Sequence, residues 1–427
     1  MISVNNSVSE RDRLESLDVL RGFALLGILL LNIIGFGLLS AAYNNPGFDL
    51  AEGSILNIAT YSLVNVLAEG AMRGLFSILF GAGVILFATG ERGKSGWIHY
   101  KRTFWLLIFG LINAYVLLWN GDILVTYALA GGLLFLFRHR SPRALVIGAG
   151  IVFLAMSLMH AAMNYGLSEA RVAAEHLATA DEPATLPIEV HQGATAWYEF
   201  VDQQELNDTE ALAELKARRG DYMSVFVWNA GKNNEIYTMV LPVFLFWDAL
   251  AMMLLGMGLY KYQVLQGARS IIFYKRLMIV GFLLGLSVNC VEIIEVIESR
   301  FDVLTSLGQM QWTYHLGRLG MSLGYIGLIL WCLKAGHFSS LRIRLAAVGR
   351  MALTNYLLQS LICGLIFSGV GVGLIGSLER FELYPIVLAI WILQLWVSPL
   401  WLERYQFGPV EWLWRCLTYG QVPSLRR

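Results

Sequence analysis

Ten long apolar stretches recur along the chain, and each has close to the roughly 20 residues that a helix needs to cross a bilayer. They predict membrane helices over 20–42, 71–90, 103–119, 121–137, 142–162, 237–260, 276–297, 316–334, 352–374 and 384–402. A shorter apolar stretch, 54–68, precedes the second of these. A single helix over 54–90 would be about 55 Å long, too long for one crossing, so we expect 54–68 to lie along the outer interface. The predicted fold class is an all-α, polytopic membrane helix bundle.

The distribution of Lys and Arg sets the predicted orientation, because cytoplasmic segments of membrane proteins carry an excess of positive charge. With ten crossings, the N-terminal segment, 91–102, 138–143, 261–276, 334–350 and 403–427 share one side, and they hold most of the 31 basic residues. We therefore predict that both termini are cytoplasmic. The acidic stretch 163–235 then forms an extracytoplasmic helical insert between two membrane halves, 1–162 and 236–427, of five helices each.

Composition narrows the class of protein. Hydrophobic residues make up 57% of the chain and charged residues only 15%, against about 25% charged residues in soluble domains. A water-soluble enzyme is therefore excluded. Nucleic-acid binding is also excluded, because 31 basic residues balance 31 acidic ones and no basic stripe exists. The four cysteines form no C-x-x-C pair, so we expect neither a disulfide framework nor a metal site.

Ionisable side chains at membrane depth are costly, so each is a candidate for a functional site. In the first predicted helix, Arg21 and Asn32 are eleven residues apart and share a helix face, with Asp18 one turn before Arg21. These three residues form a polar stripe from the cytoplasmic rim towards the middle of the bilayer. The alternative is that Arg21 is a positive-inside anchor and that Asn32 makes a helix-packing hydrogen bond.

Further polar residues lie at the ends of predicted spans. Glu69 and Arg73 have the i, i+4 spacing of an ion pair on one helix face, next to an expected helix break at Gly70. Asp122 follows Asn120 in a tight turn, where it is either functional or a cap on the next helix. Asn113, about two turns inside its span, should face the bundle interior.

Asp248 is the sharpest single candidate. It lies midway along the predicted span 237–260 and has no Lys or Arg within one helical turn. It must therefore be protonated, paired with another helix or open to a cavity. Glu292 and Glu295 approach the outer end of the next span, and one or two carboxylates there should point inward. His315 opens the following span as either a functional or an interfacial residue. The histidines other than His315 and His160 are expected in loops.

Several motifs carry a resemblance to a known family. They are 17–27 (LDVLRGFALLG), 75–81 (LFSILFG), 121–124 with 127–129, 254–257, 349–356 (GRMALTNY) with 359–360, and 408–415 (GPVEWLWR) with 417–420. On these motifs the chain resembles the YeiB family of bacterial inner-membrane proteins, whose shared domain has no settled function. The resemblance covers nearly the whole chain and implies a multi-pass protein of the bacterial inner membrane.

The start of the first helix also resembles a wider superfamily of transmembrane acyltransferases, which pass an acyl group from cytoplasmic acyl-CoA to an acceptor across the membrane. The polysaccharide O-acetyltransferases of that superfamily carry Arg-x10-His on the first helix. Arg21 matches the arginine, and Asn32 stands at the histidine position, as in the heparan-glucosaminide branch. That branch has its catalytic histidine before the next span, whereas this chain has none between Asn32 and His99.

The resemblance assigns roles to the candidates. Acyl-CoA would be the donor, held at a basic cytoplasmic mouth by Arg21 with its partner Asp18, and by Lys101, Arg102 and Arg350. Asn32 would stabilise an oxyanion, and Asp248 or His315 would act as the base. The acceptor, an unknown small molecule or envelope glycan, would meet Glu69, Arg73, Asp122, Glu292 and Glu295.

Two alternatives stay open from the sequence. One is a transporter or exporter of a small solute, in which Asp248 carries a proton or cation and Glu292 and Glu295 line an outer vestibule. The other is a membrane scaffold without turnover. In each case the expected partners are membrane lipids and a second copy of the chain.

Overall fold

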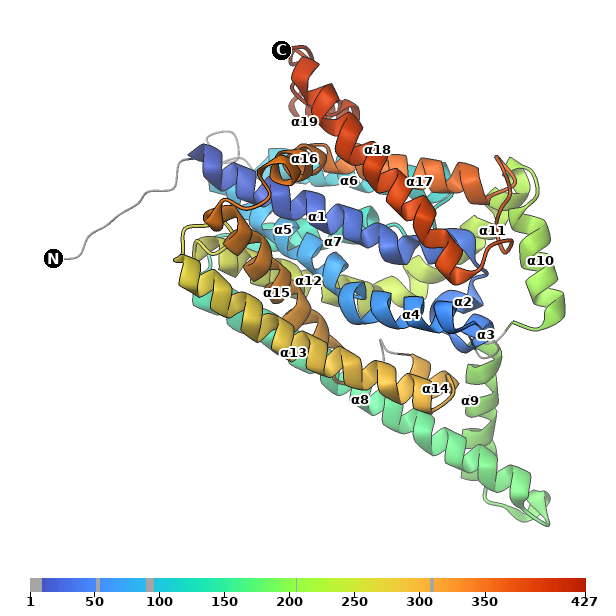
Figure 1. Ribbon diagram of the computed structural model, residues 1–427. Helices are drawn as coiled ribbons and strands as arrows, with labels where there is room; N and C mark the ends of the chain where they lie inside the picture. The colour runs from blue at the N-terminus through green and yellow to red at the C-terminus, as the bar shows by residue number, and fades with distance from the viewer. Residues whose placement is uncertain (1–9, 51–53, 90–95, 205, 308–310) are drawn as a thin grey trace.

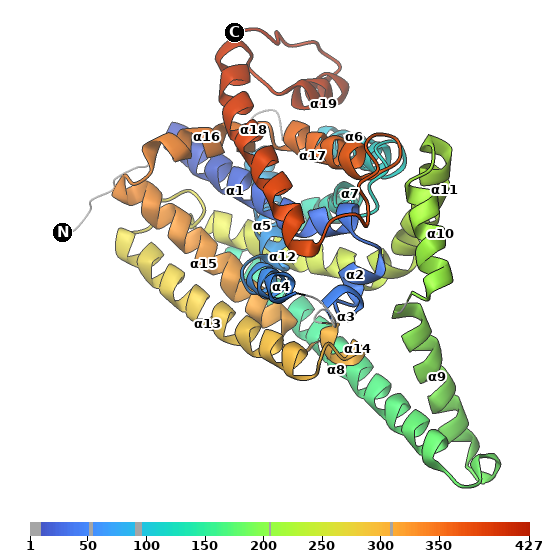
Figure 2. The ribbon, with the colours of Figure 1, turned by 45° about the vertical axis from the view of Figure 1, so that its right-hand side comes forward.

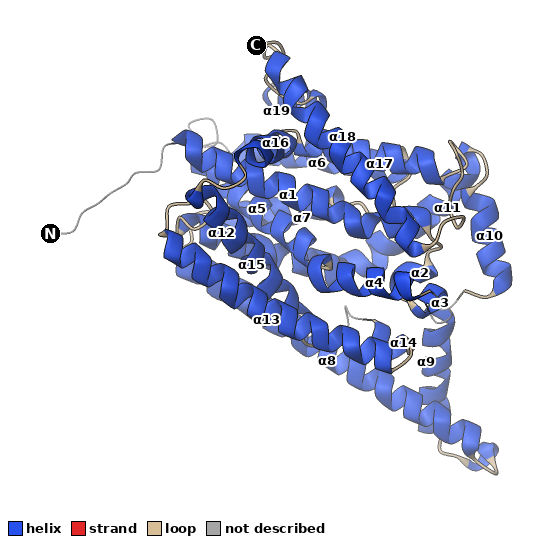
Figure 3. Cartoon of the chain, viewed as in Figure 1, coloured by secondary structure: helices blue, strands red, loops and turns tan. Residues whose placement is uncertain are grey.

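The computed structural model describes residues 10–50, 54–89, 96–204, 206–307 and 311–427. Within these ranges every extended element is helical, and no strand forms apart from an isolated bridge between Tyr405 and Arg426 (Figure 3). The predicted all-α fold is confirmed. Residues 91–95 of the predicted cytoplasmic segment 91–102 lie outside the described residues.

The helices follow the predicted order along the chain (Figure 1). Those before the insert are α1 (Glu10–Gly37), α2 (Ala41–Asn44), α3 (Gly47–Leu50), α4 (Ile55–Ala68), α5 (Ala71–Thr89), α6 (Gly96–Tyr115), α7 (Leu124–Leu134) and α8 (Pro142–Thr179). The following helices are α9 (Ile188–Gln204), α10 (Asp208–Arg218), α11 (Tyr222–Glu235), the π-helix η4 (Ile236–Leu245), α12 (Phe246–Lys261), α13 (Ile271–Glu298), α14 (Val303–Ser306), α15 (Tyr314–Ala335), α16 (Ser339–Arg350), α17 (Ala352–Phe367), α18 (Leu383–Arg404) and α19 (Pro409–Tyr419).

The chain is a multi-pass membrane protein. A helix lies over each of the ten predicted stretches. Within the described chain, seven helices are long and apolar enough to cross a bilayer, and the α16–α17 pair, bent by 83°, would make an eighth. Because α6 and α7 do not meet that criterion, the number of ten crossings and the cytoplasmic position of both termini stay predictions.

The stretch 54–68 forms helix α4, which leads into α5. Ile55–Ala88 forms a single apolar stretch of 34 residues, interrupted at Gly70, whose φ of +62° ends one helix before the next begins. The predicted break is therefore confirmed, and the placement of 54–68 along the outer interface stays a prediction. Helix α4 precedes α5 in the chain, and its buried face packs against α1 and α13.

Glycines allow the closest helix contacts of the bundle. A side-chain carbon at Gly349 of α16 would overlap the backbone oxygen of Asp18 on α1, and one at Gly22 would overlap the oxygen of Leu345. Small residues allow helix backbones to approach in this way inside membranes. Helix α1 therefore lies against α16 at the end of the bundle where the chain begins.

Helix α8 presents an apolar face that other helices leave uncovered. Ile147, Ile151, Leu154 and Leu158 are each more than 60% exposed and follow one another at helical spacing. A stripe of this kind is typical of a helix that faces lipid tails. It is consistent with membrane lipids as the surroundings of α8.

The insert begins inside a continuous helix. Helix α8 crosses the predicted boundary at 162 without a break and pairs with α9 in an arm that projects from the bundle (Figures 1 and 2). Helices α10 and α11 then return to the bundle. Helix α10 is only partly a surface helix. Arg218 is buried, because its guanidinium donates hydrogen bonds to the oxygens of Gly35 and Leu38 at the end of α1 and pairs with Glu214.

Candidate functional site

Two cavities open into the described part of the bundle at different heights along α1. The first, which we name the arginine cavity, has a volume of about 270 Å³ and is lined by Arg21, Arg102, Arg350 and Arg415. The second, the carboxylate cavity, has a volume of about 250 Å³ and is lined by Glu69 and Glu292, among others. Arg21 and Leu31 line different cavities and are ten residues apart on α1, so the two linings are separated by about 15 Å along the axis.

The arginine cavity brings together three residues of the predicted basic mouth, Arg21, Arg102 and Arg350. Asp18 holds Arg21 through an ion pair of 2.9 Å. The guanidinium of Arg102 lies over the ring of Trp414, 4.3 Å from the centroid. Lys101 does not line this cavity.

The fourth arginine, Arg415, was not predicted. It belongs to α19, which follows the last predicted span. The sequence places Arg415 only in the basic C-terminal segment 403–427. Glu411 of the same helix accepts hydrogen bonds from the backbone nitrogens of Leu353 (2.7 Å) and Thr354 (3.0 Å) at the start of α17. Burial raises the pKa of Glu411. This carboxylate attaches α19 to the bundle, so that the tail forms one wall of the arginine cavity.

His99 also lines the arginine cavity, and its predicted place in a loop is wrong. It lies in the first turn of α6, where its ring stacks on Phe135 with 4.4 Å between centroids. Its Nε2 lies 3.0 Å from the backbone oxygen of Gly131. Because an oxygen of that kind only accepts, Nε2 carries the proton and Nδ1 is left as the basic nitrogen. The hydrophobic pattern did not indicate a helix at His99, because α6 begins at Gly96, seven residues before the predicted apolar stretch 103–119.

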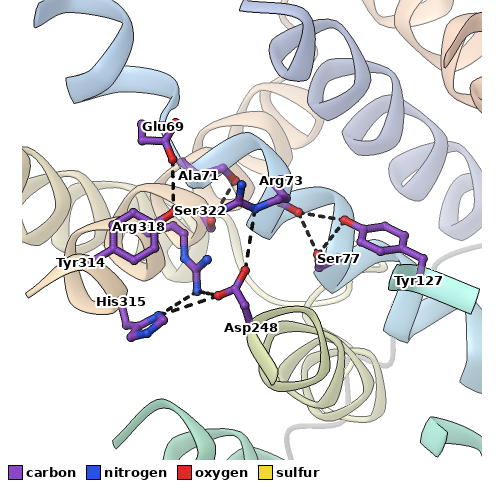
Figure 4. Close-up of polar contacts among 10 residues, drawn as sticks. All are labelled: Glu69, Ala71, Arg73, Ser77, Tyr127, Asp248, Tyr314, His315, Arg318 and Ser322. Carbon is purple, nitrogen blue, oxygen red and sulfur yellow. Dashed lines mark hydrogen bonds and ion pairs between the residues drawn. The ribbon is translucent and has the colours of Figure 1, made fainter. Parts of the chain in front are cut away.

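Asp248 lies at the centre of a buried polar cluster (Figure 4). It is 6% exposed and forms ion pairs with Arg318 of α15 and, at 3.7 Å, with Arg73 of α5. Of the three predicted alternatives, pairing with other helices is therefore confirmed. Asp248 lies in the first turn of α12, directly after the π-helix η4, which contains Pro242. Both helices belong to one candidate span, Tyr222–Lys261, so Asp248 lies within a span as predicted.

Glu69 and Arg73 do not form the predicted ion pair. The break at Gly70 removes Glu69 from the face of α5 that carries Arg73. Instead, the Tyr314 hydroxyl accepts a hydrogen bond from Arg73 Nη2 (2.8 Å) and donates one to Glu69 Oε1 (3.2 Å). The two residues are therefore connected through Tyr314 (Figure 4).

The same cluster connects the two cavities. The hydroxyls of Tyr127 and Ser77 are 2.6 Å apart, and they lie 3.2 and 2.9 Å from the backbone oxygen of Arg73. Tyr127 lines the arginine cavity, whereas Tyr314 and Arg318 line the carboxylate cavity. We name this set the polar bridge; its members are Tyr127, Ser77, Arg73, Asp248, Arg318 and Tyr314.

The polar bridge has hydrogen-bond donors to spare. Arg318 is only 1% exposed, yet its Nε and Nη1 make no hydrogen bond within the described part of the chain. Buried polar groups are normally hydrogen-bonded. Such free donors mark a place where a ligand oxygen or a water molecule belongs.

His315 is buried beside the bridge, so the interfacial alternative is wrong. Its Nδ1 lies 3.0 Å from Arg318 Nη2 and 3.8 Å from Asp248 Oδ1. Its ring stacks on His160, with 5.1 Å between centroids. His315 lines neither of the two cavities, because Arg318 lies between it and the carboxylate cavity.

The other candidates lie apart from the bridge. Asn32 is half-buried and lines neither cavity. Asp122 accepts hydrogen bonds from Asn113 Nδ2 (2.8 Å) and from the backbone nitrogen of Val125 (2.9 Å), so it caps the start of α7, and Asn113 faces inward as predicted. Glu292 points into the carboxylate cavity, while Glu295 is exposed.

The fold and the two cavities define a multi-pass helical membrane protein with a polar bridge across its interior. Residues 259–421 match a protein family described as being of unknown function, DUF418. The chain is 29% identical to the uncharacterized protein YeiB of Escherichia coli (strain K12) over 95% of this chain and 96% of that protein. It is 28% identical to the uncharacterized protein YxaH of Bacillus subtilis (strain 168) over 96% and 94% of the two chains. No solved structure matches it. These matches confirm the resemblance to the YeiB family that the sequence motifs predict.

Proposed function

We propose that the protein is an acyltransferase of the bacterial inner membrane. It takes an acyl group from acyl-CoA in the arginine cavity and delivers it to an acceptor in the carboxylate cavity. The observation that carries this proposal is the polar bridge, which joins a cavity suited to an anionic donor to a second, chemically different cavity.

The arginine cavity suits the donor. Guanidinium groups bind phosphate oxygens in a fork geometry, and Arg21, Arg350 and Arg415 supply three of them in the lining. Much of the remaining lining is apolar and aromatic, as an acyl chain requires, and it includes Tyr127 of the bridge. The thioester of a bound acyl-CoA would thus face the bridge.

The bridge suits the chemistry. Acyl transfer places negative charge on the carbonyl oxygen, and preorganised donors in a water-poor site stabilise that charge. Arg318 offers two such donors. Asp248 is engaged by two guanidinium groups, so in this mechanism it positions Arg318 and Arg73, and the base is a different residue. Glu69 belongs to the carboxylate cavity and accepts a hydrogen bond from the bridge, so it would take the proton from the acceptor.

Binding of acetyl-CoA to the purified protein tests the donor site. We expect Arg21→Ala and Arg350→Ala to weaken binding measured by calorimetry, and Arg21→Lys to restore only part of it. Lys101→Ala is the matched control, because Lys101 is a neighbouring cation outside the cavity. Wild-type protein that does not bind acetyl-CoA would contradict the proposal.

Export of a small solute is the second candidate, favoured by the same pair of cavities on either side of a closed bridge. Vesicles containing the protein and supplied with acetyl-CoA labelled separately in the acetyl and coenzyme parts distinguish the two. Transfer separates the labels, leaving coenzyme A on the side of addition. An exporter moves a solute intact and leaves the thioester unbroken.

A further inference from the structure

The negative and positive charges around the carboxylate cavity are unequal in number. Arg318 and Arg380 line it, and each has its own carboxylate partner, Asp248 for Arg318 and Asp49 for Arg380, the latter at 2.8 and 2.9 Å. Glu69 has Arg73 as its counter-charge, through the Tyr314 hydroxyl. Glu292 remains.

Glu292 has no cationic partner within the described residues. Its carboxylate accepts a hydrogen bond from Thr313, and no Lys or Arg nitrogen of the described chain lies within 4.0 Å of it. The cavity and the bridge together hold the carboxylates Glu69, Glu292, Asp248 and Asp49 against the guanidinium groups of Arg73, Arg318 and Arg380. The site is thus short of one positive charge.

Independent features of the cavity point to a polar ligand. Ser306 lines it and is 6% exposed, yet its hydroxyl makes no hydrogen bond within the described chain. Tyr43 presents an aromatic ring, whose face attracts cations, whereas the guanidinium of Arg380 already lies over the ring of Tyr61, 5.5 Å from its centroid. A buried hydroxyl without a partner, beside a tyrosine ring and an uncompensated carboxylate, is the set of groups that an organic ammonium ion with a nearby hydroxyl would satisfy.

We propose that the carboxylate cavity binds a ligand with a single ammonium group, held by Glu292 with Glu69 beside it. The ligand is either a free amine or the ammonium headgroup of a lipid such as phosphatidylethanolamine. This site stands on its own geometry and does not depend on acyl transfer in the arginine cavity.

Binding of ethanolamine to the protein in nanodiscs tests the proposal, with ethylene glycol as the uncharged control. We expect ethanolamine to bind measurably more tightly than ethylene glycol and Glu292→Gln to weaken its binding at least tenfold. Glu295→Gln is the matched control, because Glu295 lies three residues away on α13 and is exposed. A Glu69→Gln variant tests the second carboxylate, and thermal melting of each variant confirms that it is folded.

The source of the ammonium group is decided by a second arm. Short-chain phosphatidylethanolamine and phosphatidylglycerol are titrated into detergent-solubilised protein. Preference for the ethanolamine lipid over both phosphatidylglycerol and free ethanolamine identifies a headgroup site, whereas equal binding of the two lipids with tight ethanolamine binding identifies a free amine. The proposal is overturned if neither ammonium compound binds better than its uncharged control, or if Glu295→Gln has the same effect as Glu292→Gln. Acetyl-CoA binding is scored separately, so the failure of one proposal leaves the other standing.

Discussion

Replacing Asp248 by Asn tests whether the polar bridge is held together by charge. The amide keeps the shape of the side chain but removes the negative charge that faces Arg318 and Arg73. Opposite charges about 4 Å apart attract by about 4 kcal/mol at the effective dielectric constant of a protein. Because both guanidinium groups are buried, the variant must either leave them uncompensated or open the bundle to admit water or an anion.

We expect Asp248→Asn to lower the free energy of unfolding by about 3–5 kcal/mol, the cost of breaking a buried ion pair by removing one partner. Unfolding by SDS in mixed micelles, followed by tryptophan fluorescence, measures the difference. The control is Asp302→Asn, which removes the charge from the more exposed pair of Asp302 with Arg171. That pair should be worth about 0–1 kcal/mol.

A double variant makes the reasoning refutable. Arg318→Met added to Asp248→Asn removes the uncompensated charge, and Arg73 still has Glu69 as its counter-charge through Tyr314. The double variant should therefore be more stable than Asp248→Asn alone. Equal stability of wild type and Asp248→Asn, or additive losses in the double variant, would show that the bridge residues only fill space.

Three further predictions concern the packing, the tail and the topology. Gly349→Ala should prevent α16 from approaching α1 and lower the melting temperature clearly, while Gly148→Ala, in open space, should not. Because burial raises the pKa of Glu411, the protonated form is favoured in the folded tail, and its contribution to stability declines as the pH rises above the ordinary carboxyl range. Protection of α19 from proteolysis should thus increase as the pH is lowered from neutral towards the ordinary carboxyl range, and Glu411→Gln should flatten that profile. A cysteine at position 96 should resist an impermeant reagent added to intact cells and one at position 190 should react; the reverse would overturn the predicted orientation.

The helices were predictable because long apolar stretches have few other solutions in a membrane. The ends of the helices were less predictable from the sequence. The sequence of α8 continues as an amphipathic helix beyond the apolar part, so hydropathy placed the end of the helix at 162 and the structure places it at Thr179. The π-helix at Pro242 leaves no mark on hydropathy, yet it decides where Asp248 lies in its helix.

The site was only partly predictable, because residues that interact in it lie far apart along the chain. Arg21, Arg102 and Arg350 share one cavity, as the predicted orientation of the spans implies. The partners of Asp248 are 175 residues before it and 70 after it, and no local spacing indicates them. Arg415 has a sequence signal, the GPVEWLWR motif, but a helix after the last span was not expected to return to the bundle.

Arg73 provides the sharpest test of the charge count around the carboxylate cavity. If the site is short of one positive charge, Arg73→Gln should leave it short of two, since Gln can still donate to the Tyr314 hydroxyl but carries no charge. Ethanolamine should then bind more tightly, about tenfold for each 1.4 kcal/mol of added attraction. Glu292→Gln changes the count in the opposite direction, so the double variant should bind ethanolamine with nearly wild-type affinity. Weaker or unchanged binding by Arg73→Gln would refute the count, because it would mean that an additional uncompensated negative charge does not favour the ammonium ion.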